Sequence, residues 1–185
     1  MLEEYAHQLN ERMEKSLDAL RKAFNRIRTG RAHPSLLDGL SIDYYGADTP
    51  ISQLASIVVE DARTLALTLW EKNLVPEVEK SILRSDLGLN PNTAGTVIRV
   101  PLPALTEESR KALGRQAKQE AEKARVSVRN VRRDVLSNVK SLEKTKSISK
   151  DDERRIQDEV QKITDRFISR VDDLLTEKEK DLMDI

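Results

Sequence analysis

Hydrophobic residues recur at helical spacing in three long stretches of the chain. In the first stretch, residues 2–29, they lie three or four positions apart: Leu9, Met13, Leu17, Leu20, Phe24 and Ile27. This spacing puts them on one face of an α-helix. The pattern ends at Gly30 and Pro34 follows, as is typical of a helix end. The stretch therefore predicts an amphipathic helix whose apolar face needs a partner elsewhere in the chain.

The second half of the chain predicts two more amphipathic helices. The first should begin near Thr106, with acidic residues in its first turn, and continue to about Lys146. Its apolar face consists of Leu113, Ala117, Ala121, Ala124, Val128, Val131, Val135, Val139 and Leu142. Ser149 should then cap the last helix. The apolar stripe of that helix runs toward Leu182 through Ile156, Val160, Ile163, Phe167, Val171 and Leu174.

The middle of the chain follows shorter, strand-like patterns. Residues 40–44 alternate between apolar and polar, and residues 45–50 (YGADTP) are typical of a turn. Residues 56–60, 64–70 and 96–100 are further short strand candidates, the last one preceded by an expected loop at 89–95.

One short helix is predicted between these strands. Pro76 suits its first turn, Gly88 is its expected C-terminal cap, and its apolar side is Val75, Val78, Ile82 and Leu83.

Three unmatched apolar faces around this middle segment predict an α+β fold. Residues 1–30 and 106–185 should form an antiparallel three-helix bundle, and residues 31–105 a small β/α/β domain inserted between the first and second long helices. The two connectors between the domains must then lie close together. Glycine and proline in them favour a hinge, with a rigid double linker as the alternative.

Charge is distributed unevenly along the chain. The chain has 32 basic and 32 acidic residues, and hence no net charge. The net charges of its segments are +2 for residues 1–31, −4 for 32–105, +6 for 106–146 and −4 for 148–185. A neutral protein with one strongly basic helix indicates a local binding surface.

The basic helix concentrates four arginines on one face. On a helical wheel they fall within an arc of about 100°, beside the apolar face; they are Arg125, Arg129, Arg132 and Arg133, here called the arginine stripe. No acidic residue lies between the first and the last of them. The favoured interpretation is binding to a phosphate backbone, because the planar guanidinium contacts phosphate through two hydrogen bonds. The alternatives are pairing with the acidic last helix, or with an acidic protein partner.

Composition narrows the remaining function classes. Aromatic residues make up 3% of the chain, which favours folded RNA over single strands that require stacking. His7 and His33 are the only histidines and have no evident catalytic or metal-binding partner in the sequence, and cysteine is absent. The acidic, polar N-terminus differs from a presequence, and apolar runs are too short to span a bilayer. We expect a cytoplasmic, monomeric protein that is not an enzyme, without cofactor, metal or membrane contact.

Five sequence strings closely resemble the bacterial ribosome recycling factor family, in the family's order and over essentially all 185 residues. They are RTGRA (28–32), DYYG (43–46), SDLGLNP (85–91), IRVPLPALTEE (98–108) and VRNVRRD (128–134). The resemblance implies an L-shaped molecule that is similar in shape to transfer RNA. It also implies a bundle that binds ribosomal RNA of the 23S type on the large subunit after termination.

The resemblance further implies partners and site residues. Elongation factor G, hydrolysing GTP, would move the small domain, separate the subunits and free the messenger RNA, and initiation factor three would keep the subunits apart. The implied ribosomal RNA contacts are Arg28, Arg31, Arg129, Arg132 and Arg133, to which the stripe adds Arg125. The implied hinge residues are Gly30, Ala32, Pro101 and Pro103. The alternative from another class is a helical adaptor whose basic helix docks an acidic protein; an RNA-modifying enzyme lacks a candidate catalytic group.

Overall fold

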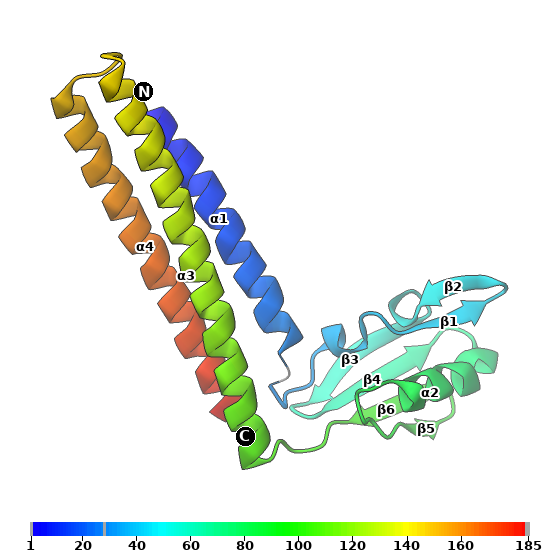
Figure 1. Ribbon diagram of the computed structural model, residues 1–185. Helices are drawn as coiled ribbons and strands as arrows, with labels where there is room; N and C mark the ends of the chain where they lie inside the picture. The colour runs from blue at the N-terminus through cyan, green and yellow to red at the C-terminus, as the bar shows by residue number, and fades with distance from the viewer. Residues whose placement is uncertain (1, 28, 184–185) are drawn as a thin grey trace. The chain divides into compact units, whose positions relative to one another are not determined.

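The chain forms two separate units, one of long helices and one that contains the strands (Figure 1). The computed structural model describes residues 2–27 and 29–183. Of these, residues 2–27 and 108–183 form the first unit, and residues 29–107 form the second. Each unit has a hydrophobic core of its own.

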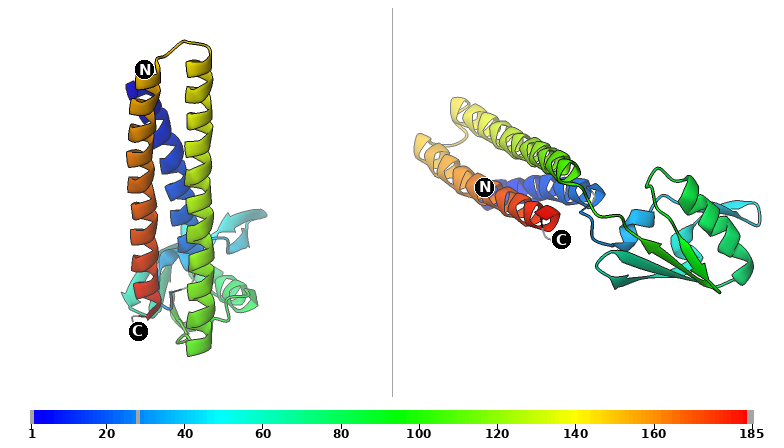
Figure 2. Two further views of the ribbon diagram at one scale, coloured as in Figure 1. Left: turned by 60° about the vertical axis from the view of Figure 1, so that its left-hand side comes forward. Right: turned by 90° about the horizontal axis from the view of Figure 1, so that it is seen from below.

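The first unit is a bundle of three helices, α1 (Leu2–Arg26), α3 (Glu107–Lys144) and α4 (Lys150–Met183). Helices α1 and α4 run in the same direction and α3 runs opposite to both, as Figures 1 and 2 show. The core contains every residue predicted for the apolar stripe of the first helix, and most of those predicted for the other two. The predicted helices and their shared apolar core are therefore confirmed.

The three helices contribute side chains of different size to this core. Buried residues of α3 are alanines and valines, whereas α1 and α4 supply larger residues, including Leu9, Met13, Ile163 and Phe167. Small and large side chains on facing helices together fill an interior at high density. Buried residues of α3 extend from Ala117 to Val139, so most of this helix is held against the other two.

Ser149 caps α4, as predicted. The backbone N–H of Asp152 donates to Ser149 Oγ at 3.1 Å, and the N–H of Ser149 donates to Asp152 Oδ2 at 3.2 Å. This reciprocal arrangement satisfies N–H groups at the helix start that have no partner within the helix. The bonds from Ser149 lower the pKa of the Asp152 carboxyl.

The second unit contains two antiparallel sheets, the helix α2 (Val75–Arg84) and three short 3₁₀ turns (34–37, 51–53 and 72–74). Strands β1 (Ser41–Tyr44) and β2 (Ala47–Pro50) form a hairpin. The larger sheet has the strand order β3-β4-β6-β5, with bounds Ala55–Asp61, Thr64–Leu69, Val97–Pro101 and Asn92–Ala94. Buried residues from its central strands include Leu65, Leu67, Ile98 and Val100, and α2 contributes Val78 and Ile82 to the same core.

Two predicted irregular segments contain strands. The turn predicted at 45–50 is limited to Tyr45 and Gly46, whose φ angles are 50° and 84°, and β2 follows directly. Two consecutive positive φ angles are typical of the tight hairpin turns that match strand twist. The loop predicted at 89–95 contains β5, which pairs with β6 through Thr93 and Ile98. Both strands are short and poor in β-branched apolar residues, so pairing with a neighbour determines their conformation.

The predicted end of the short helix was also wrong. Helix α2 ends at Arg84, and Ser85 closes it by donating from Oγ to the Ile82 carbonyl at 2.6 Å. Gly88 lies in the following turn with φ 64°. Leu83, predicted on the apolar side, is 54% exposed. The hydroxyl of Ser85 thus ends the helix before the glycine does.

Glu14 links α1 to α4 on the bundle surface. Its two carboxylate oxygens accept from Arg170 Nη1 at 2.7 Å and Nη2 at 3.0 Å, and Arg21 Nη1 donates at 3.1 Å. These interactions, the bond from Arg170 above all, lower the pKa of Glu14. Because both partners are about 40% exposed, solvent screens much of the attraction.

We predict that Glu14→Gln lowers the free energy of unfolding by about 0.5 kcal/mol at pH 7. The carboxylate's contribution is complete above its ordinary pKa, about pH 4.3, and is lost as pH falls through the lowered folded-state value. Urea unfolding of both proteins between pH 7 and strongly acidic pH measures the difference. Glu11→Gln is the control, because the ion pair of Glu11 among the described residues is with Lys15 of its own helix, at 3.1 Å. A Glu14 effect independent of pH would contradict the assignment.

Candidate nucleic-acid interface

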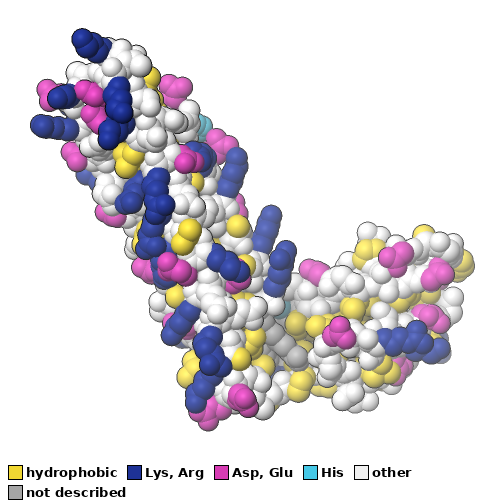
Figure 3. Space-filling view, viewed as in Figure 1, with side chains coloured by type: hydrophobic (Ala, Val, Ile, Leu, Met, Phe, Trp, Pro, Cys, Tyr) yellow, Lys and Arg dark blue, Asp and Glu magenta, His cyan; other side chains and the backbone are white. Residues whose placement is uncertain are grey.

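The arginine stripe lies along the seam between α3 and α4. Among the described residues, polar contacts cross this seam at three levels, from Lys118 to Glu179, from Arg125 to Asp172 and from Arg132 to Gln161. The α3 number rises as the α4 number falls, as the antiparallel arrangement requires. Lys and Arg side chains follow the bundle surface over α3, with Asp and Glu side chains between them (Figure 3). The residues of α4 that face the stripe therefore help to determine the surroundings of its arginines, and these surroundings differ from one arginine to the next.

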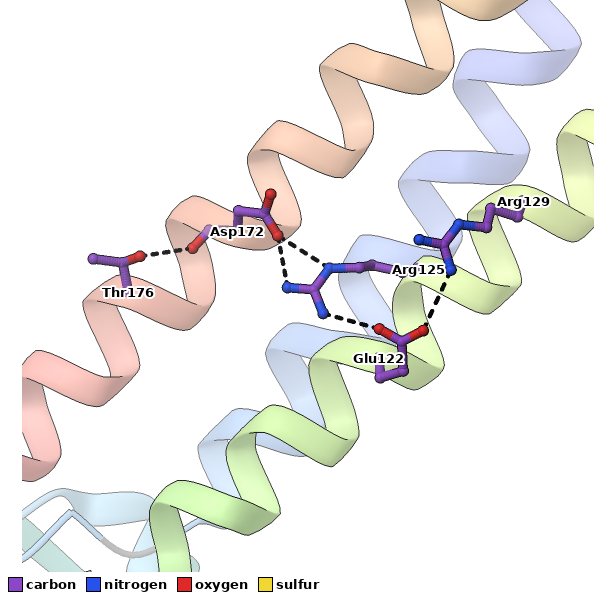
Figure 4. A network of polar contacts seen from close by, with 5 residues as sticks. All are labelled: Glu122, Arg125, Arg129, Asp172 and Thr176. Carbon is purple, nitrogen blue, oxygen red and sulfur yellow. Dashed lines mark hydrogen bonds and ion pairs between the residues drawn. The ribbon is translucent and has the colours of Figure 1, made fainter. Parts of the chain in front are cut away.

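Arg125 is the most strongly compensated member of the stripe. Its Nη2 donates to Asp172 Oδ1 at 2.6 Å, its Nε to the same oxygen at 3.0 Å, and its Nη1 to Glu122 Oε2 at 3.1 Å (Figure 4). The bonds to Asp172 raise the pKa of the guanidinium, and only 19% of the side chain is exposed. For Arg125, therefore, the structure shows pairing with the acidic last helix, which was one of the alternatives to phosphate binding.

Arg129 is compensated in part. Its Nη1 donates to Glu122 Oε1 at 3.3 Å, so that Glu122 bridges Arg125 and Arg129 on α3 (Figure 4). The two arginines lower the pKa of Glu122, the bond from Arg125 contributing most. With one shared carboxylate and 42% of its side chain exposed, Arg129 keeps donors directed to solvent.

Arg132 and Arg133 have no carboxylate partner among the described residues. Arg132 Nη1 donates to the amide oxygen of Gln161 at 3.4 Å, and its Nε is buried without a hydrogen bond. Arg133 is exposed and makes neither a hydrogen bond nor an ion pair in the described part of the chain. The neighbouring Asp134 pairs instead with Arg12 of α1 at 2.7 Å. Within the arginine stripe, positive charge without a carboxylate partner among the described residues is thus found at these two residues.

The connectors show a second constraint. The N–H of Ala32 donates to the Ala62 carbonyl at 2.8 Å, and the N–H of Leu102 donates to the Arg63 carbonyl at 2.7 Å. Ala62 and Arg63 form the turn between β3 and β4. Ala32 and Leu102, near the two ends of the second unit, are therefore fixed to adjacent residues of one turn.

The expected hinge residues differ in how they are held. Gly30 has φ 78°, a left-handed conformation that glycine adopts without strain. Pro101 is the last residue of β6, in register with Thr64, and Pro103 is exposed outside any helix or strand. With Ala32 bonded to the turn, Ala32 and Pro101 belong to the framework of the sheet.

The model of the family described as ribosome recycling factor matches residues 20–183. The chain belongs to the ribosome recycling factor family. It is 57% identical to the ribosome-recycling factor of Hahella chejuensis over 183 residues, which cover 99% of each chain. It is also 57% identical to that of Saccharophagus degradans over 185 residues, all of both chains.

Two solved structures of the family resemble the chain. A solution structure of a ribosome recycling factor is 37% identical with a TM-score of 0.75, covering all of this chain and 98% of the other. The T. thermophilus ribosome recycling factor, in models with E. coli elongation factor G bound to the E. coli post-termination complex, is 42% identical. Its TM-score is 0.66 and both chains are covered completely. The predicted family and the mixed fold of long helices and a small sheet are confirmed.

The structure distributes the family's expected RNA-binding residues over both units. Arg129, Arg132 and Arg133 share a face of α3 in the bundle. Arg31 is an exposed residue of the second unit, and Arg28 lies outside the described residues. Gln161, Asp165 and Asp172 on α4 complete the surroundings of the stripe and were not recognised in the sequence. These polar residues are spaced so that they face α3. This spacing can be recognised only once the register of α4 against α3 is known.

No helix within the described ranges is both long and apolar enough to cross a membrane. In the same ranges, no group of three or more histidine, aspartate or glutamate residues is placed to hold a metal ion.

We predict that Arg125→Ala lowers the free energy of unfolding by about 1–2 kcal/mol, because it removes a largely buried stem and leaves Asp172 without its partner. Arg133→Ala, on the same helix, should change stability by less than about 0.5 kcal/mol. Urea denaturation followed by circular dichroism compares the two variants directly. Equal destabilisation would mean that Arg125 has no special role in joining α3 to α4.

Proposed function

We propose that the chain recycles ribosomes in the cytoplasm after translation termination. In this proposal the bundle binds ribosomal RNA of the large subunit, and elongation factor G with GTP hydrolysis splits the ribosome and frees the messenger RNA. Initiation factor three then keeps the subunits apart, and the chain acts as a monomer without bond chemistry of its own. Full-length membership of the ribosome recycling factor family carries the proposal. The described complex of a relative with elongation factor G supports these partners.

The unequal compensation of the stripe supports a division of labour within it. We infer that Arg129, Arg132 and Arg133 contact phosphate, since their guanidinium donors are wholly or partly free of carboxylates. Arg125 instead holds α3 to α4 and sets the orientation of the face. Arg28 and Arg31 are proposed as further contacts on the basis of the RTGRA string alone.

The hydrogen bonds at the β3–β4 turn define where the chain can pivot. Ala32 and Leu102 are each fixed to that turn, so rotation of the backbone there would break a bond within the second unit. We infer that any hinge motion takes place in residues 29–31 and 103–106. This places Gly30 and Pro103 in the moving segments, with Ala32 and Pro101 at their inner boundary.

Light scattering tests the proposed function. Post-termination ribosomes are mixed with the protein, elongation factor G and GTP, and the loss of scattering reports subunit separation. We expect separation only when all three are present and GTP can be hydrolysed. A protein that binds an acidic competitor protein but neither sediments with large subunits nor splits ribosomes would be the helical adaptor instead.

We predict that Arg132→Ala weakens binding to purified large subunits by about tenfold or more, since it removes a charge-assisted contact to phosphate. The slope of the logarithm of affinity against that of salt concentration should also fall by about 0.7–0.9, the loss of one phosphate contact. Sedimentation at several salt concentrations measures both. Lys123→Ala is the control, because Lys123 pairs with Glu120 on another face of the same helix. Equal losses in both variants would exclude Arg132 as a specific contact.

For the hinge, we predict that Gly30→Pro reduces subunit splitting more than it reduces ribosome binding. Proline requires φ near −65°, whereas Gly30 has φ 78°, so the substitution redirects one connector. Splitting rates by light scattering and affinities by sedimentation give the two quantities. Gly39→Pro, at a glycine with φ 87° inside the second unit, controls for backbone strain away from the connectors. If splitting and binding fall equally at Gly30, the connectors act as a rigid double linker.

A further inference from the structure

The α4 partners of the basic residues on α3 change in chemical type along the seam. Lys118 faces the carboxylate of Glu179 at 3.5 Å, and Arg125 faces that of Asp172 at 2.6 Å. At the next level, Arg132 faces the neutral amide of Gln161 at 3.4 Å. Among the cross-seam pairs of the described residues, Arg132 is thus the one whose partner on α4 is not a carboxylate.

Gln161 is itself held in a fixed orientation. Its Nε2 donates to Asp165 Oδ1 at 2.8 Å, one turn further along α4. An ionised carboxylate accepts hydrogen bonds only, and a guanidinium donates only. The amide therefore has to turn its NH₂ group to Asp165 and its oxygen to Arg132. Asp165 makes its described bond to the amide and has no described ion pair with Arg132.

This arrangement orients Arg132 without cancelling its charge. The bond from Nη1 to the amide oxygen limits the conformations of the outer end of a long side chain whose Nε is already buried. A neutral acceptor leaves the positive charge intact, whereas a carboxylate would form an ion pair that an incoming phosphate must displace. The 3.4 Å bond is long, and the described residues give Nη2 no partner, so the outer end of this guanidinium is open to a further acceptor, whereas Nε is buried.

We propose that Gln161, oriented by Asp165, is a positioning residue for Arg132 in RNA binding. It holds the guanidinium on the stripe and keeps it available for a phosphate. The amide at position 161 thus selects which arginine of the seam meets RNA, while the carboxylate of Asp172 commits Arg125 to the bundle. The inference rests on the proposed function, because it assumes that Arg132 contacts ribosomal RNA.

Gln161→Glu tests the inference, because it places a carboxylate where the amide oxygen is. Gln161 is exposed, so the fold should persist, and thermal unfolding by circular dichroism checks this. We expect binding to purified large subunits to weaken about fivefold, the factor that corresponds to an exposed ion pair that must be broken. Gln161→Met, which removes the acceptor without adding charge, should weaken binding about twofold through lost orientation.

A matched control separates this effect from general repulsion between negative charges. Gln157→Glu adds the same charge one turn away on α4, at a residue whose amide bonds to Glu153 at 3.1 Å and to no arginine described here. We expect it to bind like the unchanged protein. Equal weakening by Gln157→Glu and Gln161→Glu would overturn the inference, as would unchanged binding by Gln161→Glu.

A double-substitution cycle shows whether Gln161 acts through Arg132. In an Arg132→Ala background, Gln161→Glu should cause no further loss of binding, because its target is gone. Additive losses would overturn the positioning role. The failure of the proposed function looks different, since Arg132→Ala alone would then leave binding unchanged. Weak binding by Arg132→Ala together with normal binding by Gln161→Glu would retain the function and remove only the inference.

Discussion

The burial of three apolar helix faces in one core is the constraint on which the rest of the structure depends. None of these faces has a partner within its own segment, so α1, α3 and α4 must meet although a separate unit interrupts the chain between α1 and α3. The alanines and valines of α3 fill this core together with larger residues of α1 and α4. Once that face is buried, the adjoining face of α3 is fixed at the surface beside α4. The packing of the helices is therefore sufficient to determine the position of the arginine stripe.

The surface of the bundle then decides which charges are available. Carboxylates on α3 and α4 form ion pairs with Arg125, and one of them also pairs with Arg129. Asp134, which adjoins the stripe, pairs with Arg12 of α1 instead. The four arginines look equivalent on a helical wheel, but the structure distinguishes them. Arg125 is paired within the bundle, Arg129 is paired in part, and Arg132 and Arg133 have no carboxylate partner among the described residues. A net charge counted along the sequence gives no sign of this difference, because it depends on what the neighbouring helices present.

Much of the fold was predictable because its causes are local. The apolar periodicity of the long helices, Ser149 as a cap and the strands around residues 55–69 all follow from near neighbours in the sequence. Strands β2 and β5 were missed because pairing, which is not local, determines their conformation, and Gly88 was preferred as a helix end over the hydroxyl of Ser85. The arginine stripe was recognisable, but Gln161, Asp165 and Asp172 were not. Their roles depend on the register of α3 against α4, which no pattern within one helix specifies.

The bonds from Ala32 and Leu102 to neighbouring residues of the β3–β4 turn have a topological consequence. Residues 62 and 63 are adjacent, and consecutive Cα atoms are about 3.8 Å apart. The chain therefore enters the second unit at Ala32 and leaves it at Leu102 beside the same turn. The segment between them can be lengthened, shortened or exchanged without separating the ends that the bundle must bring together. The same geometry makes the unit a natural cassette: its two ends could be joined by a few residues to give an autonomous small domain.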